Sequence, residues 1–196
     1  MPLRCILLAT ANPGKVRELR QLIAEWGPVE VRSLAEVGGF ALPSEDAATY
    51  RKNAIRKAEA VASATGCPAL ADDSGLEVVA LGGAPGVRSA RWAPTDAERV
   101  QKLLARLENV RDRRASFVCA VALAWPDGRV ETAEGRCEGS IARAPSGQGG
   151  FGYDPVFVSA DLGMTFGEAP PEAKLRTSHR ARALRALGRR LGFGGG

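Results

Sequence analysis

A short and almost continuously apolar run opens the chain. Residues 3–9 read Leu-Arg-Cys-Ile-Leu-Leu-Ala, which is the length of one strand. Because side chains alternate between the two faces of a strand, such a run predicts a central strand that is covered on both faces. After residues 10–12 the apolar positions change to the spacing of a helix. These helical positions are Val16, Leu19, Leu22 and Ile23.

Later segments alternate between helix and strand patterns. Helical spacing predicts helices over 49–64 and 95–107 and a last helix that begins after Ser178. Strand patterns lie at 29–31, 67–71, 76–81, 115–125, 129–141 and 153–158. Pro126-Asp127-Gly128 is a hairpin signal between the two long runs, and their distance from the first strand predicts a second lobe. We expect one α/β domain over residues 1–196, in two lobes with a central cleft for a ligand.

Two adjacent carboxylates, Asp72 and Asp73, follow the apolar run 67–71. Neighbouring strand residues point to opposite faces, so one carboxylate is expected to face a cleft while backbone N–H groups or an arginine hold the other. A carboxylate at the end of a buried strand can bind Mg²⁺ or accept a proton from water. Asp-Ser-Gly also favours an Asx-type turn that closes a hairpin. Residues 71–75 by themselves leave both interpretations open.

The turn after the first strand has the features of an anion site. Asn12 is a good N-cap and Pro13 suits the first helical position. Free N–H groups at a helix N-terminus attract anions, and Lys15 adds a positive charge there. Since a lysine in the first turn opposes the helix dipole, this position indicates function more than structure. The G-x-x-x-x-G-K-[ST] pattern of a P-loop is absent.

A glycine-rich segment at 147–152 has the letters of a dinucleotide-binding fingerprint. That fingerprint must follow a strand and open a helix, whereas this one follows Ala144-Pro145-Ser146 and leads into a strand pattern. Glycines that let a ligand approach the backbone, together with the ring of Phe151, fit a flat ligand such as a base better. A mobile loop with one buried aromatic residue is the alternative.

Composition and charge narrow the classes of function. The 196 residues are 45% apolar and 25% charged, which is ordinary for a globular domain. No segment approaches the roughly 20 apolar residues that span a membrane, and the start lacks a signal-peptide pattern, so we expect a cytoplasmic protein. The net charge of +5 favours anionic ligands. Arginines at helical spacing in the last helix predict a solvated face more than a nucleic-acid surface.

Cysteine and histidine usage argues against two kinds of site. The four cysteines are Cys5, Cys67, Cys119 and Cys137. They form no C-x-x-C pair, and they lie far from the single histidine in the sequence. We therefore expect buried free thiols and no zinc site. His179 has no accompanying nucleophile signature, so a Ser-His-Asp or Cys-His mechanism has no support.

Five motifs in order resemble the inosine triphosphate pyrophosphatase family over essentially the whole chain. They are Thr10-Ala11-Asn12-Pro13-Gly14-Lys15, Ala71-Asp72-Asp73-Ser74-Gly75-Leu76, Gly82-Gly83-Ala84-Pro85-Gly86-Val87, Gly149-Gly150-Phe151-Gly152-Tyr153-Asp154-Pro155 and Ser178-His179-Arg180. The resemblance implies a long twisted mixed sheet flanked by helices, and a homodimer. It also implies Mg²⁺-dependent attack of water between the α and β phosphates of deaminated purine nucleotides (ITP, dITP, XTP). The products would be a nucleoside monophosphate and pyrophosphate.

The same resemblance implies roles for individual residues. Asp73 would be the general base and a metal-associated carboxylate, and Glu45 the other acid of the metal site. Thr10, Asn12 and Lys15 would hold the triphosphate, and Ser74 would contact the substrate. Phe151 would stack on the purine, with Asp154, Lys174, His179 and Arg180 around the base and its 6-oxo group. The remaining substrate-binding positions are Ala11, Pro13, Gly14, Gly152 and Tyr153.

Two other classes of function stay open at this point. A basic nucleic-acid-binding protein would account for the pI near 9.3 and the arginine-rich last helix. It would need a continuous basic track with stacking aromatics, and the only ordered aromatic-plus-glycine loop is at 147–153. Another nucleotide hydrolase or phosphotransferase could use the same anion site and carboxylates. We expect a purine nucleoside triphosphate as the partner, and neither nucleic acid nor a membrane.

Overall fold

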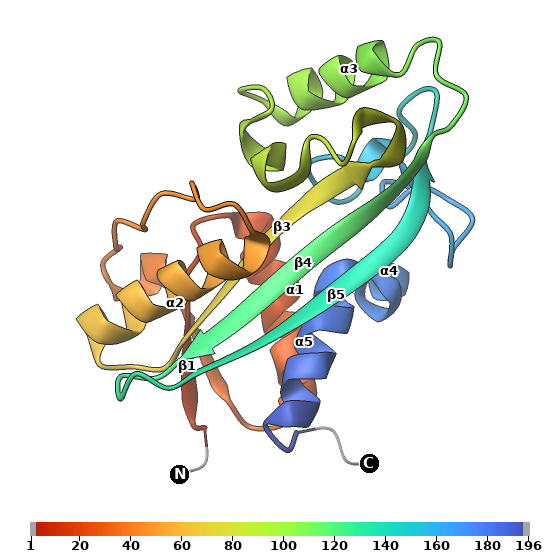
Figure 1. The fold of residues 1–196 in the computed structure, drawn as a ribbon. Coiled ribbons are helices and arrows are strands. Elements are labelled where there is room, and N and C mark those ends of the chain that lie inside the picture. Colours follow the sequence, from red (N-terminus) through yellow and green to blue (C-terminus); the bar gives the residue numbers. More distant parts are fainter. Residues whose placement is uncertain (1–2, 194–196) are drawn as a thin grey trace. The chain divides into compact units, whose positions relative to one another are not determined.

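The computed structural model describes residues 3–193 and contains one six-stranded sheet (Figure 1). The strands are β1 (Cys5–Leu8), β2 (Glu30–Ser33), β3 (Ala69–Val78), β4 (Arg114–Ala124), β5 (Val130–Ile141) and β6 (Phe157–Ser159). They are ordered β2-β1-β3-β4-β5-β6. β1 runs parallel to both β2 and β3, whereas β5 and β6 are antiparallel, so the sheet is mixed. The α/β class and the mixed sheet with helices are confirmed.

The helices begin and end where local signals place them. They are α1 (Pro13–Ile23), α2 (Tyr50–Thr65), α3 (Asp96–Arg106), α4 (Pro171–Thr177) and α5 (His179–Arg190). Asn12 caps α1 by accepting a hydrogen bond from the Lys15 N–H, as predicted. Thr95 and Glu98 form a capping box at α3. Gly66 ends α2 in the left-handed conformation, which favours glycine.

The described chain divides into two compact units. Unit 1 comprises residues up to Asp73 together with Cys119–Gly135 and the chain from Arg180 onward, and unit 2 comprises Ser74–Val118 and Arg136–His179. The boundary on β3 thus falls between Asp73 and Ser74. Two units agree with the expected two lobes, and the central cleft stays a prediction.

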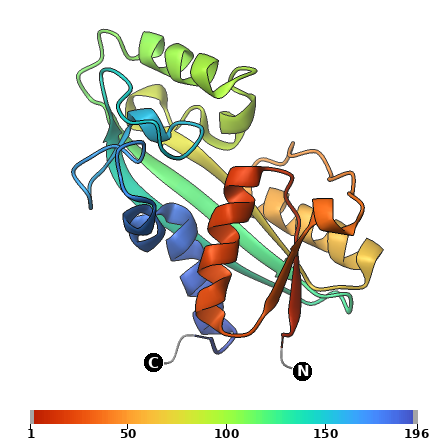
Figure 2. The ribbon, with the colours of Figure 1, turned by 180° about the vertical axis from the view of Figure 1, so that it is seen from behind.

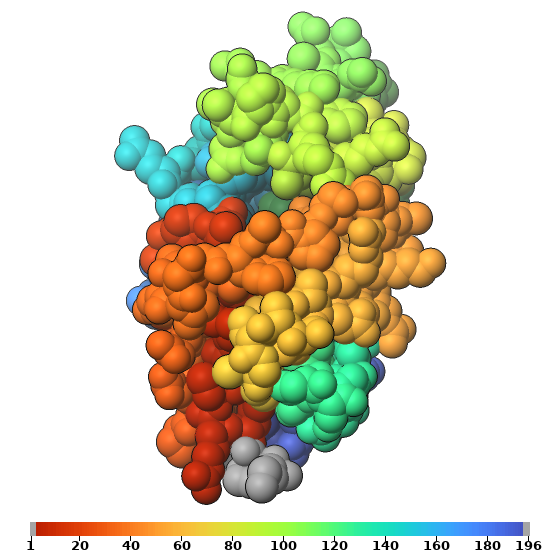
Figure 3. Space-filling model, turned by 90° about the vertical axis from the view of Figure 1, so that its left-hand side faces the viewer, coloured from red at the N-terminus to blue at the C-terminus, as the bar shows by residue number. Residues whose placement is uncertain are grey.

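Unit 1 has a core of small side chains on the α2 face of its strands. The alanines of α2 pack against Leu7 of β1, against Ala9 just after it, and against alanines of β3 and β4. Ile6 and Leu8 point to the opposite face by strand alternation, and α1 and α5 lie on that side (Figure 2). In Figure 3 the segment at 34–49, in orange, lies at the surface beside α2. Helices on both faces explain why β1 is almost continuously apolar.

Unit 2 has an aromatic core. Phe117 of β4 lies 4.6 Å from Phe157 of β6 between ring centroids, and Phe157 lies 5.2 Å from Phe166. The apolar face of α3 packs on this cluster through Val100 and Leu103. Large interlocking rings fix the positions of the connecting segments around them.

The Asx-turn interpretation of Asp-Ser-Gly is wrong. Residues 69–78 form one continuous strand, β3, in which neither Asp72 nor Asp73 is in a turn. Its first residues pair with β1, where Ala9 N–H donates to the Leu70 carbonyl at 2.8 Å. The second strand that we expected at 76–81 is the end of β3 followed by a 3₁₀ turn, Val79–Leu81. Because sheet partners satisfy the backbone, the local turn preference of Asp-Ser-Gly is overridden.

Three further segments are defined by the structure. β4 and β5 form the predicted hairpin and belong to the same sheet as β1. The strand expected at 153–158 is a 3₁₀ turn, Asp154–Val156, followed by the short β6. The glycine-rich segment after α5 is held in place at Phe193, since Phe193 N–H donates to the Gly188 carbonyl and its ring stacks on Trp26 with the ring centroids 5.3 Å apart. The rest of that segment, 194–196, lies outside the described residues.

Within residues 3–193, none of the helices is both long and apolar enough to cross a membrane.

All four cysteines are free thiols, and their solvent exposure differs. Cys119 and Cys137 are buried as expected, but Cys67 is exposed because it directly follows the turn at Gly66 that ends α2. Burial raises the pKa of the Cys119 thiol to about 12, so that thiol stays protonated at neutral pH.

These differences predict a selective thiol reaction. In the native protein a disulfide reagent such as DTNB should modify Cys67 first and should spare Cys119 and Cys137 until the protein is unfolded, because only a solvent-accessible thiolate reacts. The absorbance of the released thiolate measures the rate. Cys67→Ser should remove the fast phase, and the matched Cys119→Ser should retain it. A fast phase that survives Cys67→Ser would contradict the predicted exposure.

Candidate functional site

The β1–α1 turn of unit 1 carries the predicted phosphate-binding residues. Thr10 is buried, and its hydroxyl oxygen accepts a hydrogen bond from Asn12 N–H at 3.2 Å. Lys15 follows in the first turn of α1, with its ammonium nitrogen 3.0 Å from Asp72. Burial favours the neutral form of Lys15, but Asp72 outweighs this effect and raises its pKa. The lysine therefore stays charged at the helix N-terminus, held in place by a protein carboxylate.

Asp72 is a fully buried carboxylate between two cations. Its Oδ2 accepts hydrogen bonds from Arg180 Nε at 3.2 Å and Nη2 at 3.1 Å, in addition to its ion pair with Lys15. Burial by itself would raise the pKa of Asp72, but the two cations hold it well below the usual range. Asp72 is thus ionised throughout the neutral range, and it is the carboxylate that an arginine holds.

Arg180 is anchored on both sides. Its side chain is 1% exposed, and its second terminal nitrogen donates to Glu18 of α1. This cation at the start of α5 is therefore neutralised by two protein carboxylates, Asp72 and Glu18. This pairing was missed because the sequence interval between the partners is more than one hundred residues. Contact of Arg180 with a purine base stays a prediction.

Asp73 has the opposite electrostatic environment from its neighbour. Burial raises its pKa, and the nearby charge of Glu45 adds to this, while a 2.8 Å hydrogen bond from Asn53 Nδ2 works against it. Asn53 is oriented in turn, since its carbonyl oxygen accepts from Ala47 N–H at 3.0 Å. A carboxylate with a raised pKa is a stronger base than an ordinary aspartate. Two adjacent carboxylates with pKa values pushed apart indicate separate roles.

Lys57 connects Glu45, the second acid of the predicted metal site, to Asp72. Its ammonium group donates to Glu45 and, at 2.6 Å, to the backbone carbonyl of Asp72. Glu45 experiences an unfavourable burial effect, but Lys57 outweighs it and lowers its pKa. Sequence reasoning missed both Asn53 and Lys57. The sequence did contain a signal for them. Both are polar residues, one helical turn apart, on the buried face of α2 that is otherwise mostly alanine.

The donor set of unit 1 fits a hard divalent cation with an incomplete protein shell. Glu45 and Asp73 supply carboxylate oxygens, the ligands that Mg²⁺ prefers, and their mutual repulsion would be relieved by a cation. Among the described residues, no three His, Cys, Asp or Glu side chains group closely enough to form a metal cluster. Mg²⁺ characteristically keeps several waters and uses only one or two carboxylates plus substrate phosphates. The residues present therefore fit Mg²⁺ better than a metal that needs a full protein cage.

In unit 2 the glycine loop is held by its own carboxylate. Asp154 is buried, and its Oδ2 accepts from Phe151 N–H at 2.8 Å and from Lys174 Nζ at 2.5 Å. Gly150 has φ +74°, and a Cβ there would come within 2.0 Å of Asp154 Oδ2. Only glycine allows this approach. The loop leads into a 3₁₀ turn at Asp154 and opens no helix, in agreement with the rejection of a dinucleotide-binding fingerprint.

Aromatic rings lie next to the side chains of Lys174 and His179 in unit 2. Lys174 Nζ lies 4.9 Å from the ring centroid of Phe151 and 5.5 Å from that of Phe166. The ring of His179 stacks on Phe117 at 4.6 Å with an interplanar angle of 13°. Each cationic or polar group is thus oriented by a flat apolar neighbour. Phe151, Asp154, Lys174 and the backbone of the glycine loop are thus in contact with one another, whereas Arg180 pairs with Asp72 and Glu18 in unit 1.

The remaining predicted substrate-binding positions occupy the backbone around these clusters. Ala11, Pro13 and Gly14 form the β1–α1 turn and the start of α1. Ser74 is half-buried on β3, next to Asp73 and on the alternate face. Tyr153 is buried, and its hydroxyl donates to the Ser89 carbonyl at 3.1 Å. Whether these positions touch a substrate stays a prediction.

A family match agrees with this arrangement. Residues 6–190 match the Ham1 family. The chain belongs to the Ham1 family. The match covers both the carboxylate cluster of unit 1 and the glycine loop of unit 2, so neither is an addition to the family's fold.

Individual members are similar along nearly their whole length. A dITP/XTP pyrophosphatase of Thermus thermophilus is 53% identical over 188 residues, which are 93% of this chain and 89% of the relative. A Ham1 protein of Coxiella burnetii has a solved structure that is 41% identical with a TM-score of 0.86, covering 96% of this chain and 98% of that one. The Ham1 protein of Staphylococcus aureus is 37% identical with a TM-score of 0.84 and the same coverage.

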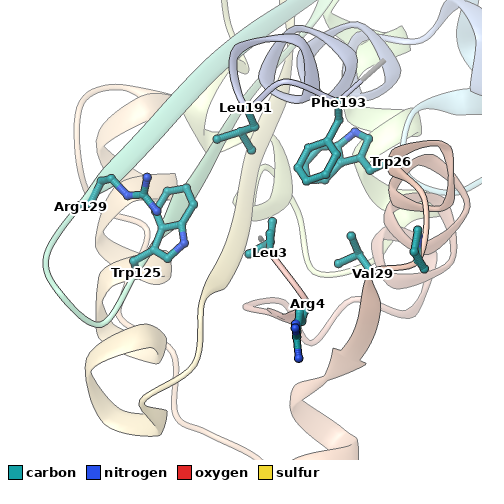
Figure 4. A pocket seen from close by; sticks show the side chains of 9 residues that line it. Leu3, Arg4, Trp26, Val29, Trp125, Arg129, Leu191 and Phe193 are labelled. Carbon is teal, nitrogen blue, oxygen red and sulfur yellow. The ribbon is translucent and has the colours of Figure 1, made fainter. Parts of the chain in front are cut away.

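Unit 1 of this Ham1 family protein also has a hollow that contains none of the predicted residues. Its volume is about 670 Å³. Figure 4 shows Trp26 beside Phe193 on one side of it and Trp125 beneath Arg129 on the other. The carboxylates and lysines of the candidate site do not line it.

The two adjacent carboxylates should respond differently to the same substitution. Asp72→Asn should lower the free energy of unfolding by about 3–5 kcal/mol, because it leaves Lys15 and Arg180 without their buried anion. Asp73→Asn should leave it unchanged or higher, because the folded state raises the pKa of Asp73 and therefore disfavours its charged form at pH 7. Chemical denaturation of both variants at pH 7 measures this. Equal losses in the two variants would contradict the assigned roles.

Proposed function

We propose that the chain is a nucleoside triphosphate pyrophosphatase that removes deaminated purine nucleotides (dITP, XTP and ITP) from the nucleotide pool. It would convert them to the monophosphate and pyrophosphate. The observation that carries this proposal is the pair Asp72 and Asp73, one ionised and holding a lysine at a helix N-terminus, the other with a raised pKa. Curated relatives about half identical to this chain are dITP/XTP pyrophosphatases, which supports it.

The phosphates would be bound by the β1–α1 turn. Asn12 and the following N–H groups of α1 form a positive helix end, and Lys15 adds a full charge held by Asp72. A lysine already fixed by a carboxylate needs little reordering when a phosphate arrives. This arrangement would orient the triphosphate for in-line attack at the α phosphorus.

Asp73 would be the general base. It accepts the proton as the oxygen of a water attacks the α phosphorus, and the bond to the bridging oxygen breaks so that pyrophosphate leaves. Its raised pKa favours proton transfer, and Asn53 fixes the orientation of the carboxylate. Mg²⁺ held by Glu45 and Asp73 would neutralise charge on the phosphate oxygens. Lys57 keeps Glu45 in position when no substrate is present.

Residues of unit 2 would recognise the purine base of the nucleotide. Phe151 offers a stacking face at the edge of a glycine loop, and Lys174 and His179 are polar groups that can donate to a 6-oxo oxygen. Adenine presents an amino group at that position, so a donor there would lose its partner at a cost of about 1–3 kcal/mol. Recognition of the 6-oxo group therefore favours hypoxanthine and xanthine over adenine.

A homodimer and a cytoplasmic location belong to the same proposal. Both follow from the resemblance and composition described above. Light scattering during size-exclusion chromatography tests the first, and a mass of one chain would overturn it. Fractionation of the source cells tests the second.

Product analysis tests the reaction directly. Wild-type protein with Mg²⁺ should release pyrophosphate from XTP, dITP and ITP, and roughly five- to 150-fold less from ATP, which corresponds to about 1–3 kcal/mol of discrimination. Asp73→Asn should abolish turnover while retaining nucleotide binding, because shape is kept and the base is lost. Ion chromatography separates pyrophosphate from orthophosphate. Orthophosphate as the product would indicate another class of nucleotide hydrolase, and tight salt-dependent binding of plain DNA without hydrolysis would indicate a nucleic-acid-binding protein.

Removal of the stacking ring should weaken the use of every purine substrate. Phe151→Ala should lower kcat/KM by a factor that corresponds to about 1–3 kcal/mol of lost transition-state stabilisation, the range for base–aromatic stacking. Phe166→Ala is the comparison, because that ring also lies under Lys174 but belongs to the buried core. The comparison variant should lose stability. An unchanged kcat/KM in Phe151→Ala would mean that this ring only packs.

A further inference from the structure

The glycine loop is fixed to α3 by a carboxylate that is absent from the predicted substrate contacts. Asp96 is the first residue of α3, and its Oδ2 accepts a hydrogen bond from Gly152 N–H at 2.7 Å. Its Oδ1 accepts from Arg99 Nη1 at 2.6 Å. One oxygen is therefore engaged by the helix itself and the other by the loop.

Arg99 determines the orientation of this carboxylate. Its Nε donates to the Ala93 carbonyl at 2.9 Å, and its Nη2 donates to the Pro94 carbonyl at 3.2 Å. A guanidinium is planar and presents its donors in a fixed geometry, so these anchors leave little freedom for the donor that contacts Asp96. The second oxygen of Asp96 is consequently directed at the loop.

Two carboxylates restrain consecutive backbone groups of the loop. Asp154 accepts from Phe151 N–H, and Asp96 accepts from the next one, Gly152 N–H. The flanking Gly150 and Gly152 have φ of +74° and +64°, a region that an unrestrained glycine leaves easily. The direction in which Phe151 presents its ring therefore depends on both carboxylates.

We propose that Asp96 is a positioning residue for the base-stacking loop and thereby sets the affinity for the nucleotide. This inference rests on the proposed function, since it takes Phe151 as the platform for the purine. Without the contact, the substrate would have to order the loop as it binds. That cost weakens the ground state and the transition state equally, so KM rises while kcat is retained.

Glu98 offers a matched control for Asp96. It is also an acid in the first turn of α3, and its carboxylate accepts hydrogen bonds from the backbone N–H and the hydroxyl of Thr95, outside the glycine loop. Loss of either acid removes a favourable interaction with the helix dipole, but only loss of Asp96 releases Gly152. Comparison of Asp96→Ala with Glu98→Gln therefore separates the loop contact from helix stability.

The kinetic experiment measures KM and kcat for XTP and dITP. Asp96→Ala should raise KM roughly three- to tenfold, as expected for the net contribution of one lost hydrogen bond, with kcat within about twofold. Asp96→Asn retains one acceptor oxygen and should recover part of the affinity. Glu98→Gln should keep both constants. A wild-type KM in Asp96→Ala, or an equal rise in Glu98→Gln, would overturn the proposal.

Hydrogen exchange without substrate gives an independent readout. The Gly152 amide should exchange faster in Asp96→Ala than in the wild type and in Glu98→Gln, because its acceptor is gone. Unchanged exchange in Asp96→Ala would overturn the proposed contact. If the wild type hydrolyses none of the nucleotides, the proposed function fails, and the exchange rates still decide whether Asp96 holds the loop.

Discussion

The buried charge of Asp72 is the constraint on which unit 1 depends. A carboxylate with no solvent exposure is stable only when cations and hydrogen bonds replace its lost hydration. Lys15 from the start of α1 and Arg180 from the start of α5 supply both, and Lys57 of α2 binds the same residue's carbonyl oxygen. One residue of β3 thereby holds the starts of two helices through its side chain and one face of a third through its backbone carbonyl.

This structural role leaves the neighbouring carboxylate available for chemistry. Strand alternation directs Asp73 away from the cations that hold Asp72, toward Asn53 and Glu45. Burial, together with the nearby charge of Glu45, raises the pKa of Asp73. Two identical side chains next to each other thus have opposite pKa shifts, because the sheet presents them to different surroundings.

Unit 2 orders its candidate ligand surface in another way. Its glycine loop has no regular structure, yet carboxylates accept two successive N–H groups and Tyr153 adds a buried hydroxyl contact. Tyr153 belongs to the same buried core as the rings of Phe117, Phe157 and Phe166, which pack against one another. A platform of this kind combines close backbone approach with a defined ring orientation.

The sequence by itself determined what depends on near neighbours and on motif order. The cap at Asn12 and the hairpin at Pro126-Asp127-Gly128 followed from signals within a few residues, and the family followed from the order of five motifs along the chain. Only the tertiary structure decided that Asp72 and Asp73 lie inside one strand, that Arg180 meets Asp72, and that Asp96 holds Gly152. These outcomes depend on which strands pair and on which helix ends meet. No local preference encodes such contacts between residues far apart in the chain.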